Sequence, residues 1–305
     1  MTQSVRIAIQ LDLDWPLKRH HEPYSGIQDY VKQHQLAWEL VPDEFPGPWI
    51  KPTKKARGYD AIVGRVTKAA ADSASRAKIP VVNLWTNSPV ANKVPSVLSD
   101  YRELGRMAGE HLIARGLRCL GGAGFRQDVG TRQFFQGLKS VAKEHGVPST
   151  LHLSWFNYRN SERSWHRYTS QLDEWISQWN LPIGIASIYD NSARSIATMC
   201  VRRGLRIPEE VAIIGGGDEP VQCESIEPEL SSIDVGHYRQ GYEAAKLLHG
   251  MLDGLKPPAG PLYTPPADLV ARQSTDVYAV ADKTVGRAIR FIAENCGRPI
   301  RVADV

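Results

Sequence analysis

Short β-rich runs alternate with amphipathic helical segments along most of this 305-residue chain, and this alternation limits the folds that it can adopt. Strands separated by helices form parallel sheets, because each helix returns the chain to begin the next strand in the same direction. The pattern falls into two consecutive series. We therefore predict an α/β protein of two doubly wound parallel-sheet lobes joined by a hinge.

The first series has five predicted strands and two predicted helices. The strands are expected at residues 5–11, 38–41, 61–64, 81–84 and 97–99, and the helices at 25–35 and 100–115. The second helix has a clear beginning, because Asp100 and Glu103 have the spacing of a capping box. Gly116 ends it.

The second series follows the same rule. Its strands are predicted at 119–123, 150–156, 184–188, 211–215 and 230–235, and its helices at 131–144, 164–179, 192–203 and 237–253. Trp165, Trp175 and Trp179 lie at helical spacing, which is typical of core or interface packing. A Pro-rich stretch at 257–266, a short strand at 268–271 and a separate helix at 282–294 complete the chain.

Composition and charge restrict the environment more than the function. The net charge is +4 with Lys and Arg spread along the chain, so charge argues neither for nor against DNA binding. No apolar run is long enough for a membrane span, and Met1 leads directly into a strand, so we expect a cytoplasmic protein without a signal peptide. Four cysteines match no metal-ligand spacing, which favours buried structural thiols: Cys119, Cys200, Cys223 and Cys296.

Polar and aromatic residues follow several of the predicted strands. Ligands of open parallel α/β sheets bind beyond the carboxyl ends of the strands, so these residues are the candidate site. Carboxylates accept bonds from adjacent hydroxyls, guanidinium groups donate two, and indoles cover apolar sugar faces, a set that suits a polyol. The candidates are Asp12, Asp14, Trp15, Arg65, Trp85, Arg126, Arg132, Asp190, Asp218 and Glu219.

Each candidate also has a purely structural interpretation. Asp190 could cap a helix, Arg126 and Arg132 could be solvated charges at a helix start, and Trp15 and Trp85 could be core or rim residues. The shared position at the strand ends supports the group more than any single member.

Motifs of the common enzyme classes are missing from the sequence. The glycine-rich segments 121–124 and 215–217 complete neither a dinucleotide-binding nor a Walker pattern, and they are typical of tight turns at strand ends. His20, His21 and Glu22 lack the spacing of metal ligands, and we assign them to a polar loop. We predict no metal, no cofactor and no enzymatic activity.

Three stretches resemble the effector domains of the lactose- and galactose-repressor family, which have the type I periplasmic-binding-protein fold. The first runs from Ser99-Asp100-Tyr101 to Gly116, the second from Leu230-Ser231-Ser232 to Asp253-Gly254, and the third from Pro265-Pro266 to Ser274-Thr275. With the alternating pattern they extend the resemblance over residues 5–275. The resemblance implies a first lobe of 5–115 with 236–262, and a second lobe of 117–235 with 263–276.

The last part of the chain, from residue 277, is similar to the opening of an AraC-type DNA-binding domain, in the segments 285–295 and 300–305. A repressor-type effector domain followed by an AraC-type domain is the arrangement of the xylose operon regulators. The resemblance implies a cytoplasmic homodimeric transcription regulator that binds D-xylose or another pentose between its lobes. Operator DNA would be bound through the C-terminal domain, and we expect no specific DNA binding without its recognition helix.

The family's ligand residues carry over only in part. Asp190 matches the family's aspartate after a second-lobe strand. Arg132 lies beside the family's arginine, where a gapless match gives Thr131, and Asp218 lies one place after an aspartate, where a gapless match gives Gly217. These departures leave the sugar's identity open. A solute-binding protein for sugar transport and a sugar-acting enzyme are the alternative interpretations.

Overall fold

The computed structural model describes residues 4–51, 58–154, 161–276, 283–295 and 299–302. The chain forms two compact units, which we call unit 1 (Met1–Asp100 and Val235–Ala267) and unit 2 (Tyr101–Asp234 and Asp268–Val305). The chain therefore passes from one unit to the other at three places.

Unit 1 is built on a four-stranded parallel sheet of order β2-β1-β3-β4. Its strands are β1 (Val5–Gln10), β2 (Trp38–Pro42), β3 (Ala61–Gly64) and β4 (Val81–Asn83). A parallel pair, β5 (Val97–Ser99) with β11 (Leu262–Thr264), continues from β4 through a single bridge between Asn83 and Ser96. All carboxyl ends of these parallel strands lie at one edge, where β1 leads into the segment around Asp12.

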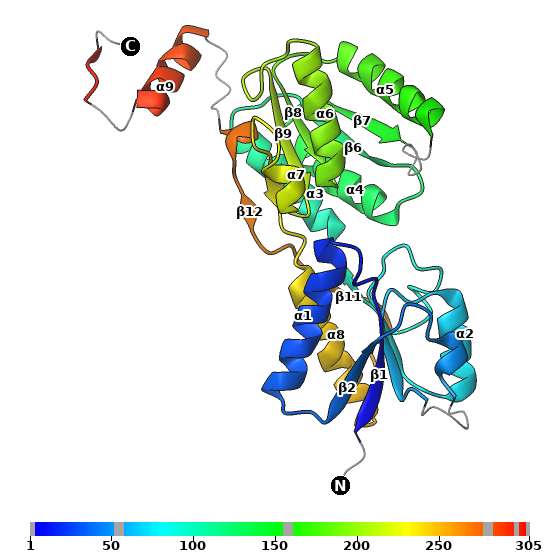
Figure 1. Ribbon diagram of the computed structural model, residues 1–305. Coiled ribbons are helices and arrows are strands. Elements are labelled where there is room, and N and C mark those ends of the chain that lie inside the picture. Colours follow the sequence, from blue (N-terminus) through cyan, green and yellow to red (C-terminus); the bar gives the residue numbers. More distant parts are fainter. Residues whose placement is uncertain (1–3, 52–57, 155–160, 277–282, 296–298, 303–305) are drawn as a thin grey trace. The chain divides into compact units, whose positions relative to one another are not determined.

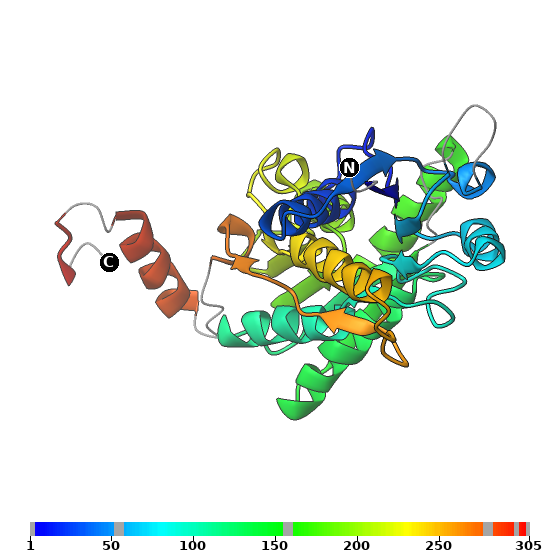
Figure 2. The ribbon, with the colours of Figure 1, turned by 90° about the horizontal axis from the view of Figure 1, so that it is seen from below.

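The helices of unit 1 cover both faces of this sheet (Figure 1). Helices α1 (Lys18–Gln33) and α8 (His237–Leu252) pack side by side on one face, as Figures 1 and 2 both show. Helix α2 (Lys68–Ala77) covers the other face, and a 3-10 turn (Gly47–Trp49) lies against it. The side chains of β1 alternate between the two faces, so Ile7 and Ile9 contact α1 and α8, whereas Ala8 contacts the α2 side.

Unit 2 contains a six-stranded sheet of order β12-β10-β9-β8-β6-β7. Its strands are β6 (Leu120–Phe125), β7 (Ser149–Ser154), β8 (Ile183–Ser187), β9 (Val211–Gly216), β10 (Ser231–Ile233) and β12 (Leu269–Val270). Only β12 is antiparallel to its neighbour. All residues of β6, β8 and β9 are buried, as expected for strands that are covered on both faces.

Two layers of helices enclose the sheet of unit 2. Helices α3 (Tyr101–Ala114) and α4 (Val129–Glu144) pack together on one face, and α5 (Glu162–Ser177) and α6 (Asp190–Arg202) cover the other. Trp175 and Leu172 of α5 are buried in the core beneath the second pair, which confirms the packing role predicted for the tryptophan stripe. The short helix α7 (Pro220–Cys223) follows β9, and a 3-10 turn (Gln273–Thr275) follows β12.

Helix α9 (Lys283–Asn295) is the last helix of the described residues, and it is amphipathic. Its boundaries agree with the predicted helix at 282–294 within one residue at each end. Val285 and Ile292 of this helix are exposed to about 45%.

The structure confirms the α/β class and the two units with parallel sheets, and it also changes several details. Helix α3 had been assigned to the first lobe, but it belongs to unit 2 because it packs along α4. Strand β11, which was not predicted, belongs to unit 1 because it pairs with β5. The last two residues of the strand predicted at 150–156 lie outside the described residues.

Helix α1 begins at Lys18 rather than at residue 25, so the prediction of a polar loop at residues 20–22 was wrong. His20 and His21 are consecutive helical residues and therefore point in different directions. Helix α2 was missed because its buried stripe consists of small residues, namely Ala70, Ala71 and Ala74. Cys200 and Cys223 are buried free thiols, Cys119 is partly buried, and Cys296 lies outside the described residues.

Candidate functional site

In unit 1 the segment after β1 folds back onto the start of α1. The backbone N–H of Asp12 donates to Nδ1 of His20 at 3.1 Å. The carboxylate of Asp12 accepts a bond from the backbone N–H of Trp15, also at 3.1 Å. Asp12 therefore fixes the turn that presents Asp14 and Trp15, both of which are exposed.

His20 is the buried polar centre of this region. Its side chain accepts the Asp12 N–H at Nδ1, so the neutral ring carries its proton at Nε2. Nε2 is buried and has no hydrogen-bond partner among the described residues. Burial, followed by the nearby guanidinium groups of Arg65 and Arg19, lowers the pKa of His20 to about 4. At neutral pH, His20 thus offers one N–H donor and no charge.

Two arginine–tryptophan pairs surround this histidine. The guanidinium carbon of Arg19 lies 4.8 Å from the ring centroid of Trp15, and that of Arg65 lies 5.0 Å from Trp85. Trp85 is held in place because its backbone exchanges two hydrogen bonds with the side chain of the buried Asn83, at 3.0 and 3.1 Å. Cation–π contacts of this kind orient the guanidinium groups as well as the indoles.

Carboxylates lie close to the same strand ends. Glu44 has a raised pKa, first because of desolvation and then because Asp12, Asp14 and Asp43 repel its negative form. The backbone carbonyl of Glu44 accepts a bond from Nε2 of the buried Gln10 at 3.0 Å. Unit 1 therefore collects both hydrogen-bond donors and carboxylate acceptors at one edge of its sheet.

In unit 2, Asp190 is the first residue of α6 and is only 2% exposed. Its Oδ1 accepts a bond from the hydroxyl of Ser232 at 2.6 Å, and its Oδ2 accepts the backbone N–H of Glu219 at 2.9 Å. The thiol of Cys223 also donates to this carboxylate. Burial raises the pKa of Asp190, and these three hydrogen bonds act in the opposite direction.

Glycines at the carboxyl end of β9 and directly after it make room for this carboxylate. A side chain at Gly215 would overlap with Oδ1 of Asp190, and a Cβ at Gly217 would lie 3.1 Å from Oδ2. Gly217 has a φ of +125°, which other residues rarely adopt. The tight-turn interpretation of this glycine run is therefore incomplete, because the run also accommodates a buried carboxylate.

Asp218 and Glu219 lie beside Asp190 in unit 2. Asp218 forms an ion pair with Arg272 at 2.8 Å, and the two side chains are only 16% and 12% exposed. The backbone N–H of Asp218 donates to the hydroxyl of Ser232 at 3.0 Å, so one serine connects both aspartates. The structure thus brings together three predicted residues and adds Ser232 and Arg272, which the sequence offered only as members of two family motifs.

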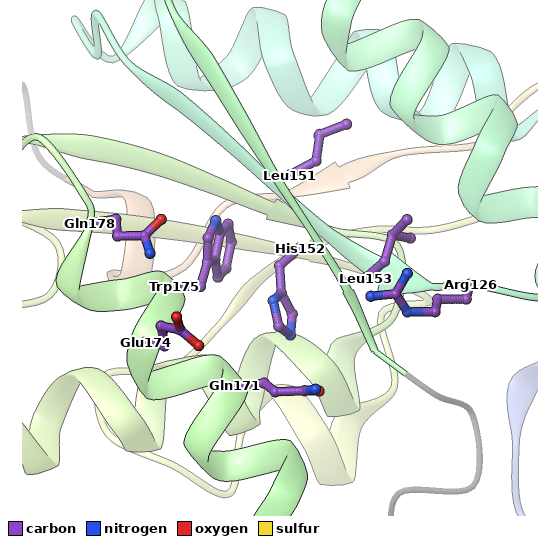
Figure 3. Close-up of a pocket in the computed structure, with 8 residues that line it drawn as sticks. All are labelled: Arg126, Leu151, His152, Leu153, Gln171, Glu174, Trp175 and Gln178. Atoms are coloured by element: carbon purple, nitrogen blue, oxygen red, sulfur yellow. The ribbon is translucent and has the colours of Figure 1, made fainter.

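The two predicted arginines of unit 2 lie elsewhere. Arg132 is an exposed residue in the first turn of α4, whereas the neighbouring Thr131 is fully buried and donates to Asp128 at 2.8 Å. Asp128 caps α4 and also accepts a bond from the hydroxyl of Tyr189 at 3.0 Å. Arg126 lines a separate groove of about 340 Å³ between β7 and α5 (Figure 3).

The described residues contain neither a metal-binding cluster nor a membrane-spanning helix. Within the described ranges, no group of three or more His, Cys, Asp or Glu side chains is arranged to hold a metal ion. None of the helices found in these same ranges is both long and apolar enough to cross a bilayer.

Two sheets with helices on both faces, three chain crossings between the units and polar residues beyond the strand ends define the class of periplasmic-binding-protein-like domains. The sequence comparison agrees: residues 109–275 match the family of periplasmic binding protein-like domains. The chain belongs to this family.

Characterised relatives are transcription regulators. The chain is 25% identical over 290 residues to the xylose operon regulatory protein of Escherichia coli K12, covering 92% of this chain and 72% of that protein. It is also 25% identical over 292 residues to the xylose operon regulatory protein of Haemophilus influenzae Rd, covering 92% of this chain and 73% of that protein.

A solved structure confirms the fold independently. A xylose-binding transcription activator superimposes with a TM-score of 0.77 at 22% identity, over 99% of this chain and 78% of that one. A LacI family regulator from Enterococcus faecium with bound ribose superimposes with a TM-score of 0.66 at 18% identity. The superposition covers 91% of this chain and 100% of that one.

Proposed function

We propose that this chain is the effector-binding part of a transcription regulator that responds to a sugar, with D-xylose or another pentose as the effector. The observation that carries the proposal is the similarity to the xylose operon regulatory protein, which extends over 92% of the chain. The sugar acts by binding one conformation of the regulator more tightly than another.

The proposed contacts in unit 1 are the residues at the carboxyl end of its sheet. His20 donates from Nε2, Arg65 donates a fork, and Asp12 and Asp14 accept from sugar hydroxyls. The indoles of Trp15 and Trp85 cover the apolar faces of the ring. His20 is not among the candidates predicted from the sequence, because the sequence pattern placed it in a polar loop.

The proposed contacts in unit 2 are Asp218 and Glu219, which lie beside Asp190, together with the separate and exposed Arg132 in the first turn of α4. Asp190 acts as a positioning residue, because its carboxylate holds the backbone of Glu219 and the hydroxyl of Ser232. Arg126 is left out of the proposed ligand site, because its groove is formed by β7 and α5.

Isothermal titration calorimetry against D-xylose, L-arabinose, D-ribose, D-glucose, D-galactose and L-fucose tests this proposal. We expect binding of at least one pentose, weakened about tenfold by Arg65→Ala and by Asp218→Asn. Arg76→Ala on the exposed part of α2 is the matched control and should leave the affinity unchanged. Absence of binding across the panel would contradict the proposal.

We also propose that α9 opens an AraC-type DNA-binding domain, and that the regulator acts as a cytoplasmic homodimer on operator DNA. The support is the similarity of segment 285–295 to the first helix of such domains. A gel shift of the intact gene product with DNA upstream of pentose-catabolism genes tests this role. We expect a protein–DNA complex whose amount changes when the sugar is added. Turnover of the sugar in an NMR time course would contradict the role as a regulator.

A further inference from the structure

Strand β7 lies at the edge of the unit 2 sheet formed by the described residues. Its sequence, Ser149-Thr-Leu-His-Leu-Ser154, contains neither a proline nor a residue that is charged at neutral pH. Exposed edge strands usually carry charges, prolines or bulges that prevent pairing with another strand. An edge with none of these features within its own residues is ready to pair.

The backbone of β7 presents alternate residues to its outer side. The N–H of Leu120 donates to Pro148 and that of Arg126 donates to Ser154, both at 3.0 Å. In a parallel ladder with this register, the amides of Thr150, His152 and Ser154 bond to β6. The N–H and C=O groups of Leu151 and Leu153 therefore point away from β6.

A groove of about 340 Å³ runs along this edge, and the adjacent helix α5 forms its wall (Figure 3). Trp175 supports the groove, since its Nε1 donates to Thr150 at 3.0 Å and its ring stacks on His152 at 5.1 Å. Burial, followed by the charge of Arg126, lowers the pKa of His152 to about 4, so the middle of the groove is uncharged at neutral pH. The α5 wall consists of Gln171, Glu174, Trp175 and Gln178.

The two charges of the groove lie on opposite sides of His152. Glu174 lies on one side and Arg126 on the other, as Figure 3 shows. Arg126 follows β6, the strand that pairs with β7. Its backbone N–H donates to the carbonyl of Ser154, so Arg126 lies at the carboxyl end of β7. If β7 of a second copy paired antiparallel with this edge, the order of the two charges would be reversed in that copy. The positive charge of each copy would then lie opposite the negative charge of the other.

We propose that the β7 edges of two copies of this chain pair antiparallel, so that one sheet continues across both copies. Leu151 of each copy then exchanges backbone hydrogen bonds with Leu153 of the other, and Arg126 of each copy faces Glu174 of the other. This interface rests on the homodimer of the proposed function, but it involves neither the proposed ligand nor any of the proposed ligand contacts.

Sedimentation equilibrium of the wild-type chain and of charge-reversal variants tests the interface. Arg126→Glu and Glu174→Arg should each weaken the dimer at least tenfold, and the double reversal should restore most of the affinity. Arg76→Glu, the same change on exposed α2, should have no effect. A monomer at every concentration would overturn the proposal, as would a dimer that is indifferent to both single reversals.

Hydrogen exchange at single-residue resolution gives a second, independent test. The Leu151 and Leu153 amides should become protected as the protein concentration rises, whereas the His152 amide should be protected at all concentrations. Rapid exchange of both leucine amides in the dimer would exclude pairing through β7.

Discussion

The helices of units 1 and 2 pack in the same way, but the polar residues at the strand ends differ in their hydrogen bonding. In unit 1, α1 crosses α8 at Gly26, where a side chain would overlap with the backbone of Tyr238. In unit 2, α3 crosses α4 at Gly105, where a side chain would overlap with the backbone of Phe134. Each crossing thus depends on close backbone approach at a glycine.

The polar residues at the strand ends show the difference. In unit 2 the carboxylate of Asp190 receives hydrogen bonds from Ser232, Glu219 and Cys223. In unit 1, Nε2 of His20 and Nε of Arg19 are buried donors without a partner among the described residues. Since such groups are costly when they stay unpaired, we expect the His20 donor to serve a ligand, whereas the acceptors of the Asp190 carboxylate are already used within unit 2.

Acidification should show the largest effect and should separate the two units. Burial is the first cause that lowers the pKa of His20 in unit 1 and of His111 and His152 in unit 2, in each case to about 4. The unfolded value is 6.5, so unfolding takes up protons as the pH falls from 6.5 towards 4. The free energy of unfolding should decrease by roughly 2 to 3 kcal/mol for each histidine, or on the order of 7 kcal/mol for the three, between pH 7 and pH 4.5, measured by urea denaturation.

The control is the double variant His111→Gln with His152→Gln, which removes the two unit 2 histidines whose pKa is lowered by burial. Its stability should depend less on pH, with the remaining loss assigned to unit 1. An unchanged pH profile in this variant would show that the acid sensitivity comes from carboxylates instead.

Substitution of Asp190 tests whether the unit 2 network is structural. Asp190→Ala leaves the Ser232 hydroxyl and the Glu219 N–H buried without an acceptor, so we expect a loss of about 3 kcal/mol in unfolding free energy. Asp190→Asn keeps one acceptor and should lose less. Asp14→Ala, at an exposed position of unit 1, should change the stability by less than about 0.5 kcal/mol.

The order of strands and helices could be predicted from the sequence because the apolar period changes clearly between 2 and 3.6 residues. The start of α1 and the whole of α2 were not predicted, for physical reasons. Helix α1 contains Pro23 and begins with consecutive polar residues, which hide its start, and α2 buries only alanines. Because the start of α1 was assigned to a loop, the burial of His20 was not predicted.

The proximity of some candidate residues was predictable, but their partners were not. Asp190 and Asp218 both bond to Ser232 and so lie close together, as expected for residues that follow parallel strands ending at one edge. Their partners Ser232 and Arg272 are distant in sequence, and no local pattern connects them. Whether a carboxylate is satisfied internally depends on such tertiary partners, and sequence spacing alone does not contain this information.

Alanine at the two helix crossings tests the feature that the units share. Gly26→Ala and Gly105→Ala each force backbone against a new methyl group, and we expect each to cost about 2 kcal/mol, measured by urea denaturation. Gly260→Ala is the control, because its added methyl group meets open space. If Gly26→Ala destabilised the protein no more than Gly260→Ala, the inference that α1 and α8 cross in close backbone contact at Gly26 would be wrong.

Substitution of His20 should have the smallest effect and tests the capacity attributed to unit 1. His20→Phe removes the Nε2 donor, so the affinity for the pentose identified in the panel should fall about tenfold, or ~1.4 kcal/mol. His20→Gln retains an N–H donor and should lose less. Because His20 has a pKa of about 4, wild-type affinity should be constant between pH 6 and pH 8. An affinity that changed around pH 6.5 would show instead that the ligand contacts a titrating imidazole, and the contrast between a neutral donor in unit 1 and a satisfied carboxylate in unit 2 would fail.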